Sequence, residues 1–128
     1  MDWYSVKLIY KYTITDEPNP FLVDKFFSGR TKFYEESVIL VVADSFEDAY
    51  KVAESNASME VYMNKYGQTV TMELYNTVDC FKFYEQPQAL TEVYSTIFSC
   101  DVNADIESLV DKRYEKCTIE EMHMLRHK

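Results

Sequence analysis

Glycine and histidine are scarce in this sequence, and their scarcity excludes several kinds of site. The 128 residues include two glycines and two histidines. A phosphate-binding loop of the P-loop or dinucleotide-binding type needs several closely spaced glycines, so neither can be written here. We interpret His123 and His127 as exposed side chains rather than as a metal pair or a catalytic base. We therefore expect no metal, no cofactor and no enzymatic activity.

Paired cysteines and long apolar runs are also missing. Cys80, Cys100 and Cys117 are an odd number at wide spacings, which is typical of reduced thiols rather than of a disulfide framework or a zinc site. No segment approaches the roughly 18 uncharged apolar residues of a membrane-spanning helix. Residues 1–7 lack the basic and apolar regions of a secretory signal. These features predict a cytoplasmic protein that does not enter a membrane.

Basic residues are fewer than acidic residues in this sequence. Thirteen Lys and Arg residues against 22 Asp and Glu give a formal net charge of −9. Nucleic acids and anionic membranes reward clustered cations, so both are poor direct partners, whereas a basic protein is a good one. The alternative is that the charge only keeps the protein soluble.

Aromatic residues, by contrast, are abundant. Hydrophobic residues make up 47% of the chain, and there are eleven Tyr, eight Phe and one Trp. This content predicts one domain over residues 1–128, with a core at about 3–98 and a helical segment at about 101–127. Tyrosine interleaved with carboxylates, as in Tyr34-Glu35-Glu36, would suit a surface that binds Lys and Arg. Alternatively, the tyrosines line a half-buried sheet.

Hydrophobic periodicity predicts two strands and a helix in the first half of the chain. Alternation over 3–12 is typical of a strand, and so are residues 33–43, whose second half is continuously apolar. The connection at about 16–32 carries Phe21, Leu22, Phe26 and Phe27, which we expect to hold part of it down. Ser45 and Asp48 form a capping-box pattern before a helix over about 46–58. Residues 59–63 either continue this helix or are irregular.

The second half predicts further strands and then helices. After a turn at 64–67, residues 69–75 and 78–84 form either two strands or one long strand bent near 76–77, and 92–98 form a last strand. A helical stripe follows at Val102, Ile106, Leu109, Val110 and Tyr114, and Thr118 with Glu121 begins a short helix through Met122 and Leu125. The fold class is α+β, an antiparallel or mixed sheet of about five strands with one main helix and C-terminal helices packed on it.

Several short motifs occur in an order that resembles a known domain family. They are Trp3-Tyr4-Ser5-Val6-Lys7-Leu8, the Glu-Glu-Ser strand from Tyr34 to Val41 leading into a helix, the Tyr66-Gly67 turn, and Glu92-Val93-Tyr94-Ser95. Over roughly residues 3–98 the chain resembles an uncharacterised family of small bacterial α+β domains. The resemblance carries no catalytic residues that could be transferred.

In character the chain also resembles the immunity proteins of contact-dependent inhibition and polymorphic toxin systems. That resemblance implies a basic toxin domain, of the nuclease type, as the partner, and we expect a monomer or a weak homodimer. Eight residues are candidates for partner binding: Glu47, Asp48, Glu54, Asp101, Asp105, Glu107, Tyr34 and Glu35.

Two other functions remain open. A regulatory or peptide-binding module would have an exposed sheet edge and would bind with little salt dependence. An enzyme of unrecognised type would have a deep pocket that holds convergent carboxylates.

Overall fold

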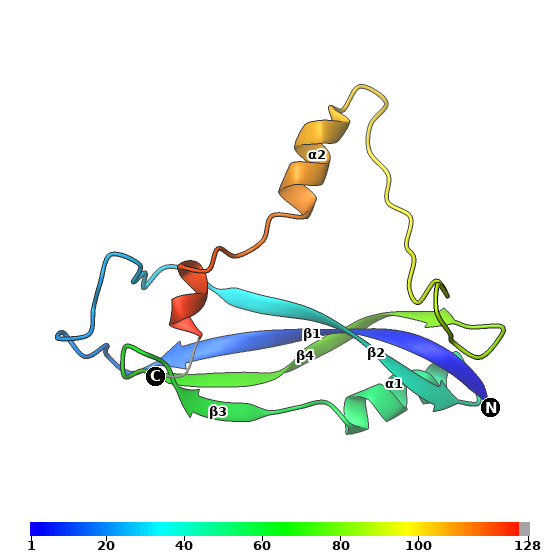
Figure 1. Ribbon diagram of the computed structural model, residues 1–128, viewed down its shortest axis with the longest axis horizontal. Helices are drawn as coiled ribbons and strands as arrows, with labels where there is room; N and C mark the ends of the chain where they lie inside the picture. Colours follow the sequence, from blue (N-terminus) through cyan, green and yellow to red (C-terminus); the bar gives the residue numbers. More distant parts are fainter. Residues whose placement is uncertain (126–128) are drawn as a thin grey trace.

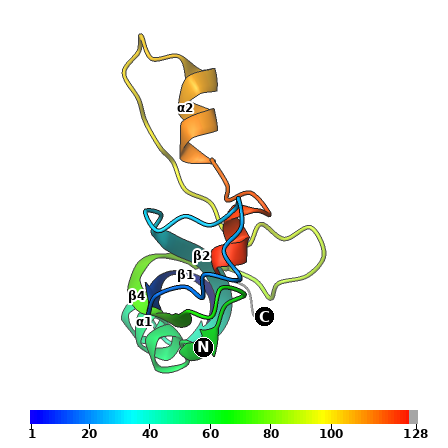
Figure 2. The same ribbon diagram turned by 90° about the vertical axis from the view of Figure 1, so that its left-hand side faces the viewer.

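The computed structural model describes residues 1–125 as a curled four-stranded antiparallel sheet with one helix packed against it (Figures 1 and 2). The strand order is β2-β1-β4-β3. The elements are β1 (Asp2–Thr15), β2 (Phe33–Ala43), α1 (Phe46–Ser55), β3 (Glu60–Met63), β4 (Thr69–Lys82), α2 (Ile106–Arg113) and a 3₁₀ helix (Glu121–Met124). The α+β class is confirmed, but the sheet has four strands rather than about five. His123 is half-buried and packs edge-to-face on Phe26, so the interpretation of it as an exposed side chain is wrong. His127 lies outside the described residues.

Strand β1 is central, and its alternation decides which face is buried. Tyr4, Val6 and Leu8 are almost fully buried, and each faces α1 because side chains two residues apart lie on the same face of a strand. β1 pairs with β2 along Tyr4↔Val41 and with β4 along Tyr4↔Lys82. The register with β4 shifts twice, between Lys7 and Tyr10, and such irregularities increase the local twist of a sheet.

Helix α1 covers the inner face of this sheet. It begins as its sequence predicts, because the Ser45 hydroxyl accepts a hydrogen bond from the Asp48 backbone N–H at 3.1 Å. Ala49 and Ala53 are fully buried against the strands. Their small side chains allow a close approach of helix to sheet, where a larger side chain would force the packing apart. The helix ends at Ser55, three residues before the predicted end.

A second core closes the opposite end of the sheet. Phe33, Tyr66 and Met124 are buried together there, and Leu22 and Phe27 from the long connection pack against them. The expectation that aromatic and aliphatic residues hold this connection down is therefore confirmed for these two, but it is wrong for Phe21, which is 95% exposed.

Asn64 joins the parts of this second core by hydrogen bonds. It is fully buried, and its amide nitrogen donates to the carbonyl of Met124 at 2.7 Å and to Gln68 Oε1 at 3.2 Å. Its side-chain oxygen accepts from the backbone N–H groups of Tyr66 and Gln68, each at 3.0 Å. A buried amide satisfied in this way fixes the turn and the end of the described chain to one another.

Both alternatives for residues 59–63, a continuation of the helix and irregular structure, are wrong. Residues 60–63 form β3, which pairs with the start of β4 along Glu60↔Met72 and Met63↔Thr69. The predicted turn between them contains Gly67 at a φ of 79°, a conformation that favours glycine. Residues 69–82 form one continuous strand, so the single-strand alternative holds for this region.

The predicted strand over 92–98 is wrong. The start of this segment lies against the face of the sheet opposite α1 and pairs with none of the four strands. It is held there by side chains: the Ser5 hydroxyl donates to the carbonyl of Val93, and the Tyr94 hydroxyl donates to Asp79 Oδ2 at 2.6 Å. Burial and this hydrogen bond raise the pKa of Tyr94 to about 12.

The expectation that the C-terminal helices pack on the sheet is half right. The 3₁₀ helix does so through Met124, and the Thr118 hydroxyl caps it by accepting from the Glu121 N–H at 3.1 Å. Helix α2 instead projects away from the sheet on the side opposite α1, and none of its residues is buried (Figures 1 and 2). Among the described residues, no helix is long and apolar enough to cross a membrane.

Candidate functional site

A groove runs along the start of β2, where the sheet has a free edge. Within residues 1–125, β1 is the only strand that pairs with β2. The outer backbone of β2 is therefore open to another chain, because an edge strand leaves every second N–H and C=O group without a ladder partner. We call the adjoining hollow, with a volume of about 570 Å³, the β2-edge groove.

The inner wall of the β2-edge groove carries tyrosine and glutamate. Tyr34 is 57% exposed and makes an edge-to-face contact with Tyr75, with ring centroids 6.2 Å apart. Glu36 lies two residues on and is 3.6 Å from Lys7 Nζ. Glu35 points to the other face of the strand, where it accepts a hydrogen bond from the Tyr12 hydroxyl. Burial, and then this hydrogen bond and the charge of Glu35, raise the pKa of Tyr12.

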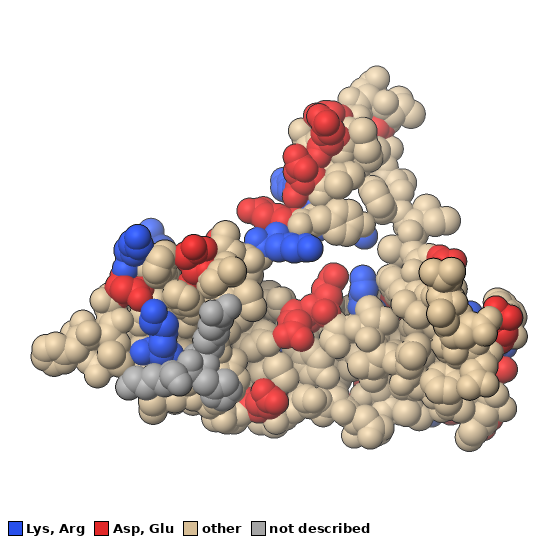
Figure 3. Space-filling model, viewed as in Figure 1, with Lys and Arg blue, Asp and Glu red and all other residues tan. Residues whose placement is uncertain are grey.

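The outer wall comes from the segment after α2. It consists of Arg113, Tyr114, Glu115, Lys116, Cys117, Met122 and Leu125. Arg113 stacks on Phe98, with 4.7 Å from its guanidinium carbon to the ring centroid. Figure 3 shows acidic side chains where β2 passes beneath α2, with basic side chains facing them across a hollow. Within residues 1–125 neither Glu35 nor Arg113 takes part in an ion pair, and Glu35 is exposed although one of its oxygens accepts from Tyr12.

Beyond the groove, β2 continues as an exposed apolar strand. Val38, Leu40 and Val42 point to the face opposite α1 and are each about two-fifths or more exposed. Together with Tyr34 and Glu36 they make one row, because side chains at every second position share a face. The row changes from acidic and aromatic at its start to aliphatic at its end.

The eight candidate residues do not form one surface. Glu47, Asp48 and Glu54 lie on α1, and Asp101, Asp105 and Glu107 lie at or before the start of α2, on the opposite side of the molecule (Figure 1). Tyr34 and Glu35 belong to neither group and line the β2-edge groove.

Most of the acids at the two helix starts and on α1 have local partners. Glu47 pairs with Lys51 at 3.2 Å, and Glu54 accepts from the Thr77 hydroxyl at 3.0 Å. Asp101 accepts from the Asn103 N–H at 2.9 Å, and Asp105 accepts from the Ser108 hydroxyl at 2.8 Å. The contacts of Asp101 and Asp105 are typical of turns and helix starts, that of Glu47 is an ion pair along α1, and that of Glu54 joins α1 to β4. Local structure therefore explains these carboxylates without a binding partner.

Sequence reasoning missed several residues of the groove. Tyr12 lies on the neighbouring strand, and Tyr114 and Leu125 come from a segment that is folded back from far along the chain. Glu36 could have been found, because it belongs to the Tyr-Glu-Glu motif that singled out Tyr34 and Glu35. The thiols of Cys80, Cys100 and Cys117 are all free, as predicted, and Cys117 lines the groove.

Comparison with protein-family models identifies the domain. Residues 3–95 match the family described as a domain of unknown function, DUF4288. The chain belongs to this family. The match begins at the second residue of β1 and covers the rest of the sheet and α1, so the DUF4288 domain supplies the inner wall of the groove. The outer wall, residues 113–125, lies beyond the match. No curated protein and no solved structure matches the chain.

Proposed function

We propose that this DUF4288 protein is a non-catalytic binding protein of the immunity type, which neutralises a basic, nuclease-type toxin domain. The observation that carries the proposal is the free edge of β2 beside exposed Tyr34, Glu35 and Glu36. An extended segment of the toxin would pair with the β2 backbone, as partners do in strand addition. Its Lys or Arg side chains would lie against the two carboxylates and the tyrosine ring.

The charge of the whole chain supports the same partner. A net charge of −9 attracts a basic protein at a distance and increases the rate of association. Nuclease toxins need cations to hold phosphate, so a protein that occupies those cations with carboxylates blocks the substrate site. Apolar side chains of the bound segment would cover Val38, Leu40 and Val42.

A regulatory peptide-binding module is the second candidate, and the free β2 edge supports it as well. The two functions differ in the source of the affinity. An immunity protein that depends on Glu35 and Glu36 binds much more weakly as the salt concentration rises, whereas backbone pairing with a neutral peptide changes little.

The test is rescue of growth by co-expression with the protein encoded by the neighbouring gene. We expect the wild-type chain to rescue the cells and to co-purify with that protein. A Glu35→Lys/Glu36→Lys variant should lose rescue and bind at least about tenfold more weakly, because two attractive contacts become repulsive.

The matched control is Glu47→Lys/Glu54→Lys, which makes the same charge change on α1, on the other side of the sheet. This variant should keep rescue and lose only part of the association rate. Loss of rescue by the α1 variant alone would place the interface on α1. Failure of the wild-type chain to bind the neighbouring protein would refute the immunity function.

A further inference from the structure

The two edge strands of the sheet differ in how they are protected from other chains. Edge strands of soluble proteins are usually short, or carry lysine, proline or a bulge, because their open backbone groups pair readily with another strand. β3 follows this rule, since it has four residues and begins with Glu60. β2 does not, because residues 37–43 contain no charged residue and no proline, and the register with β1 continues without a shift from Phe33 to Ala43. Within residues 1–125, the second half of β2 is therefore a regular apolar edge that is open to pairing.

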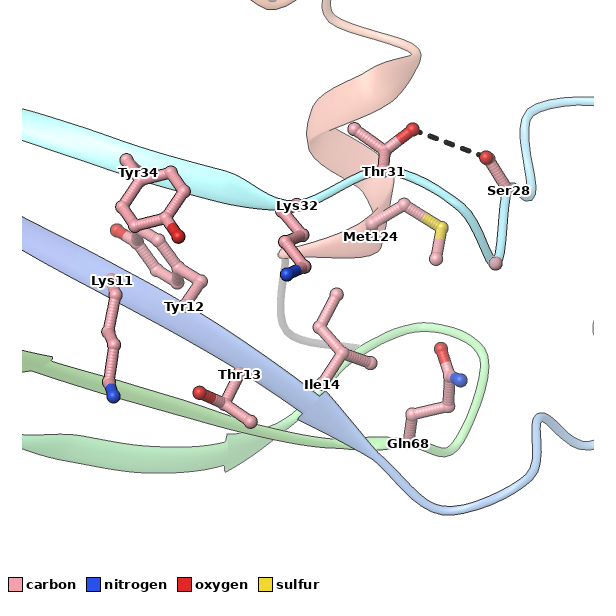
Figure 4. A pocket seen from close by; sticks show the side chains of 11 residues that line it. Lys11, Tyr12, Thr13, Ile14, Ser28, Thr31, Lys32, Tyr34, Gln68 and Met124 are labelled. Carbon is pink, nitrogen blue, oxygen red and sulfur yellow. Dashed lines mark hydrogen bonds between the residues drawn. The ribbon is translucent and has the colours of Figure 1, made fainter.

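Two hollows with walls from other parts of the chain lie beside the start of β2. The outer wall of the β2-edge groove faces residues 33–36. A second cavity, of about 430 Å³, lies between the start of β2, β1 and the long connection, and Tyr34 lines it together with Thr31 and Met124 (Figure 4). None of residues 37–43 lines either hollow. An added strand therefore meets fewer other segments at the second half of β2 than at its start.

The exposed side chains of this half match those of a second copy of the same strand. Two identical strands can pair antiparallel about a two-fold axis beside one residue, and residues equally far from the axis on either side then face each other. With the axis at Leu40, Leu40 faces Leu40 of the second copy, and Val38 of each copy faces Val42 of the other. All three side chains are exposed in the single chain. Every aliphatic side chain of the row then meets another aliphatic side chain, which favours pairing.

The charges near this axis limit the affinity but do not prevent the pairing. The nearest carboxylates along the strand are Glu36 and Asp44, which would lie opposite each other at both ends of the paired segment. Glu36 is 3.6 Å from Lys7 Nζ, and Asp44 is 3.8 Å from the N-terminal amine, so each charge is partly offset. The remaining repulsion, between two copies of net charge −9, is screened by salt. Pairing should therefore become tighter as the salt concentration rises.

We infer that the chain forms a weak homodimer in which residues 37–43 of two copies pair antiparallel about Leu40 and join the two sheets into one. The association is weak because the paired segment is short, and small interfaces are typical of transient complexes. This dimer needs no toxin and does not rest on the proposed function. It uses the same edge, however, so a second copy and a toxin segment bound along β2 exclude each other.

The first test is analytical ultracentrifugation of the full chain in reducing buffer, at concentrations from about 5 µM to about 1 mM. We expect a monomer at the lowest concentration and mostly dimer at the highest, with a Kd between about 10 and about 500 µM. Raising the salt concentration from about 0.1 M to about 0.5 M should lower this Kd. Binding of a basic toxin responds to salt in the opposite direction, so the two interactions can be distinguished.

Lysine variants of the two edge strands locate the contact. Leu40→Lys places two ammonium groups side by side at the axis and should raise the Kd of the dimer at least about tenfold. Val61→Lys is the matched control, because Val61 is 62% exposed on the other edge strand, β3, and the variant makes the same change of charge. Its effect on the Kd should stay below about threefold. Leu40→Thr replaces Leu40→Lys if circular dichroism shows that the lysine disturbs folding.

A pair of cysteine variants tests the register. Both are made in a Cys100→Ser/Cys117→Ser background, because these two native thiols are exposed. In Leu40→Cys the new thiols lie opposite each other, with their Cα atoms about 4.5–5.5 Å apart, so oxidised glutathione should link the two copies by a disulfide. In Val38→Cys the new thiols are about 14 Å apart along the paired strands, too far for a disulfide.

Three results would overturn the inference. The first is a chain that remains a monomer at about 1 mM and at both salt concentrations. The second is an equal loss of affinity in the Leu40 and Val61 variants, or no loss in either, which would place the contact between copies elsewhere. The third is a disulfide in Val38→Cys that forms as fast as the one in Leu40→Cys, which would exclude an axis at Leu40.

Discussion

At the scale of single residues, Asp24 is the contact that ties the long connection to the rest of the protein. Its carboxylate accepts from Lys65, from the Tyr66 hydroxyl and from the Phe26 N–H. The hydrogen bond from Lys65, followed by that from Tyr66, lowers the pKa of Asp24 from 3.8 to about 2. Burial and the bond to Asp24 raise the pKa of Tyr66 to about 12. These two pKa shifts favour the ionised carboxylate of Asp24 and the protonated hydroxyl of Tyr66.

This arrangement predicts a stability that depends on acid. A carboxylate with a lowered pKa in the folded state stabilises that state fully above its unfolded pKa, here near 3.8, and loses this contribution as the pH falls through about 2. Asp24→Asn should therefore unfold at a lower urea concentration than wild type at pH 6, and the difference should shrink steadily from pH 4 to pH 2.

The measurement is urea unfolding followed by circular dichroism over that pH series. Asp111→Asn is the control, because Asp111 is exposed on α2 and makes no hydrogen bond or ion pair among the described residues. It should match wild type at every pH. A constant difference between Asp24→Asn and wild type from pH 6 to pH 2 would contradict the role given to Asp24.

Local residue contacts were predictable, whereas distant ones were not. The caps at Ser45 and Thr118 follow from residues three apart, and the structure contains both. Lys65 is 41 residues from Asp24, and only the β3–β4 turn brings the two together. The spacing of these two residues in the sequence does not predict that they form a pair, because they come together only once the β3–β4 hairpin has folded.

At the scale of elements, alternation of apolar and polar residues correctly predicted the strands that bury only one face. β1 and β4 follow that pattern, and β2 combines an apolar run with an exposed acidic start. β3 was missed because four residues are too few to show a period, although the turn at 64–67 required a strand on each side of it. The strand predicted over 92–98 was wrong for a different reason. The residues have a high strand propensity, but a segment forms a strand only when its backbone pairs with another strand, and this one does not.

Helix α2 shows the same limit for helices. Its periodicity predicted a helix correctly, but no periodicity says which surface the apolar side chains will meet. Since no residue of α2 is buried, we expect the sheet to fold independently of it. A Leu109→Pro variant, which breaks α2, should change the free energy of global unfolding by less than about 0.5 kcal/mol.

The reference variant for this prediction is Ala53→Pro in α1. Ala53 is fully buried against the sheet, so a proline there should cost about 3 kcal/mol or more. Both free energies come from urea titrations of the full chain. If Leu109→Pro destabilises the protein as much as Ala53→Pro, then α2 packs on the sheet in solution and the β2-edge groove is narrower than described.

At the scale of the whole molecule, the negative charge is divided between structural and accessible carboxylates. Acids on α1 and near the start of α2 have partners in turns, helix starts and ion pairs. Glu35 and Glu36 also have partners, Tyr12 and Lys7, but both side chains stay exposed on the edge strand β2. The sequence pointed to Tyr34 and Glu35 through the interleaving of tyrosine and glutamate. It could not point to the groove, because the outer wall is contributed by a segment about 80 residues later, whose position depends on the packing of Met124.

Backbone amide hydrogen exchange along β2, with and without the protein encoded by the neighbouring gene, tests the proposed toxin binding most directly. Pairing of this protein with the free edge should slow exchange at alternate amides of residues 33–43, because only every second N–H of an edge strand points outward. The amides of α1 should exchange at the same rate in both samples. Slower exchange confined to α1 or α2, with β2 unchanged, would contradict the account.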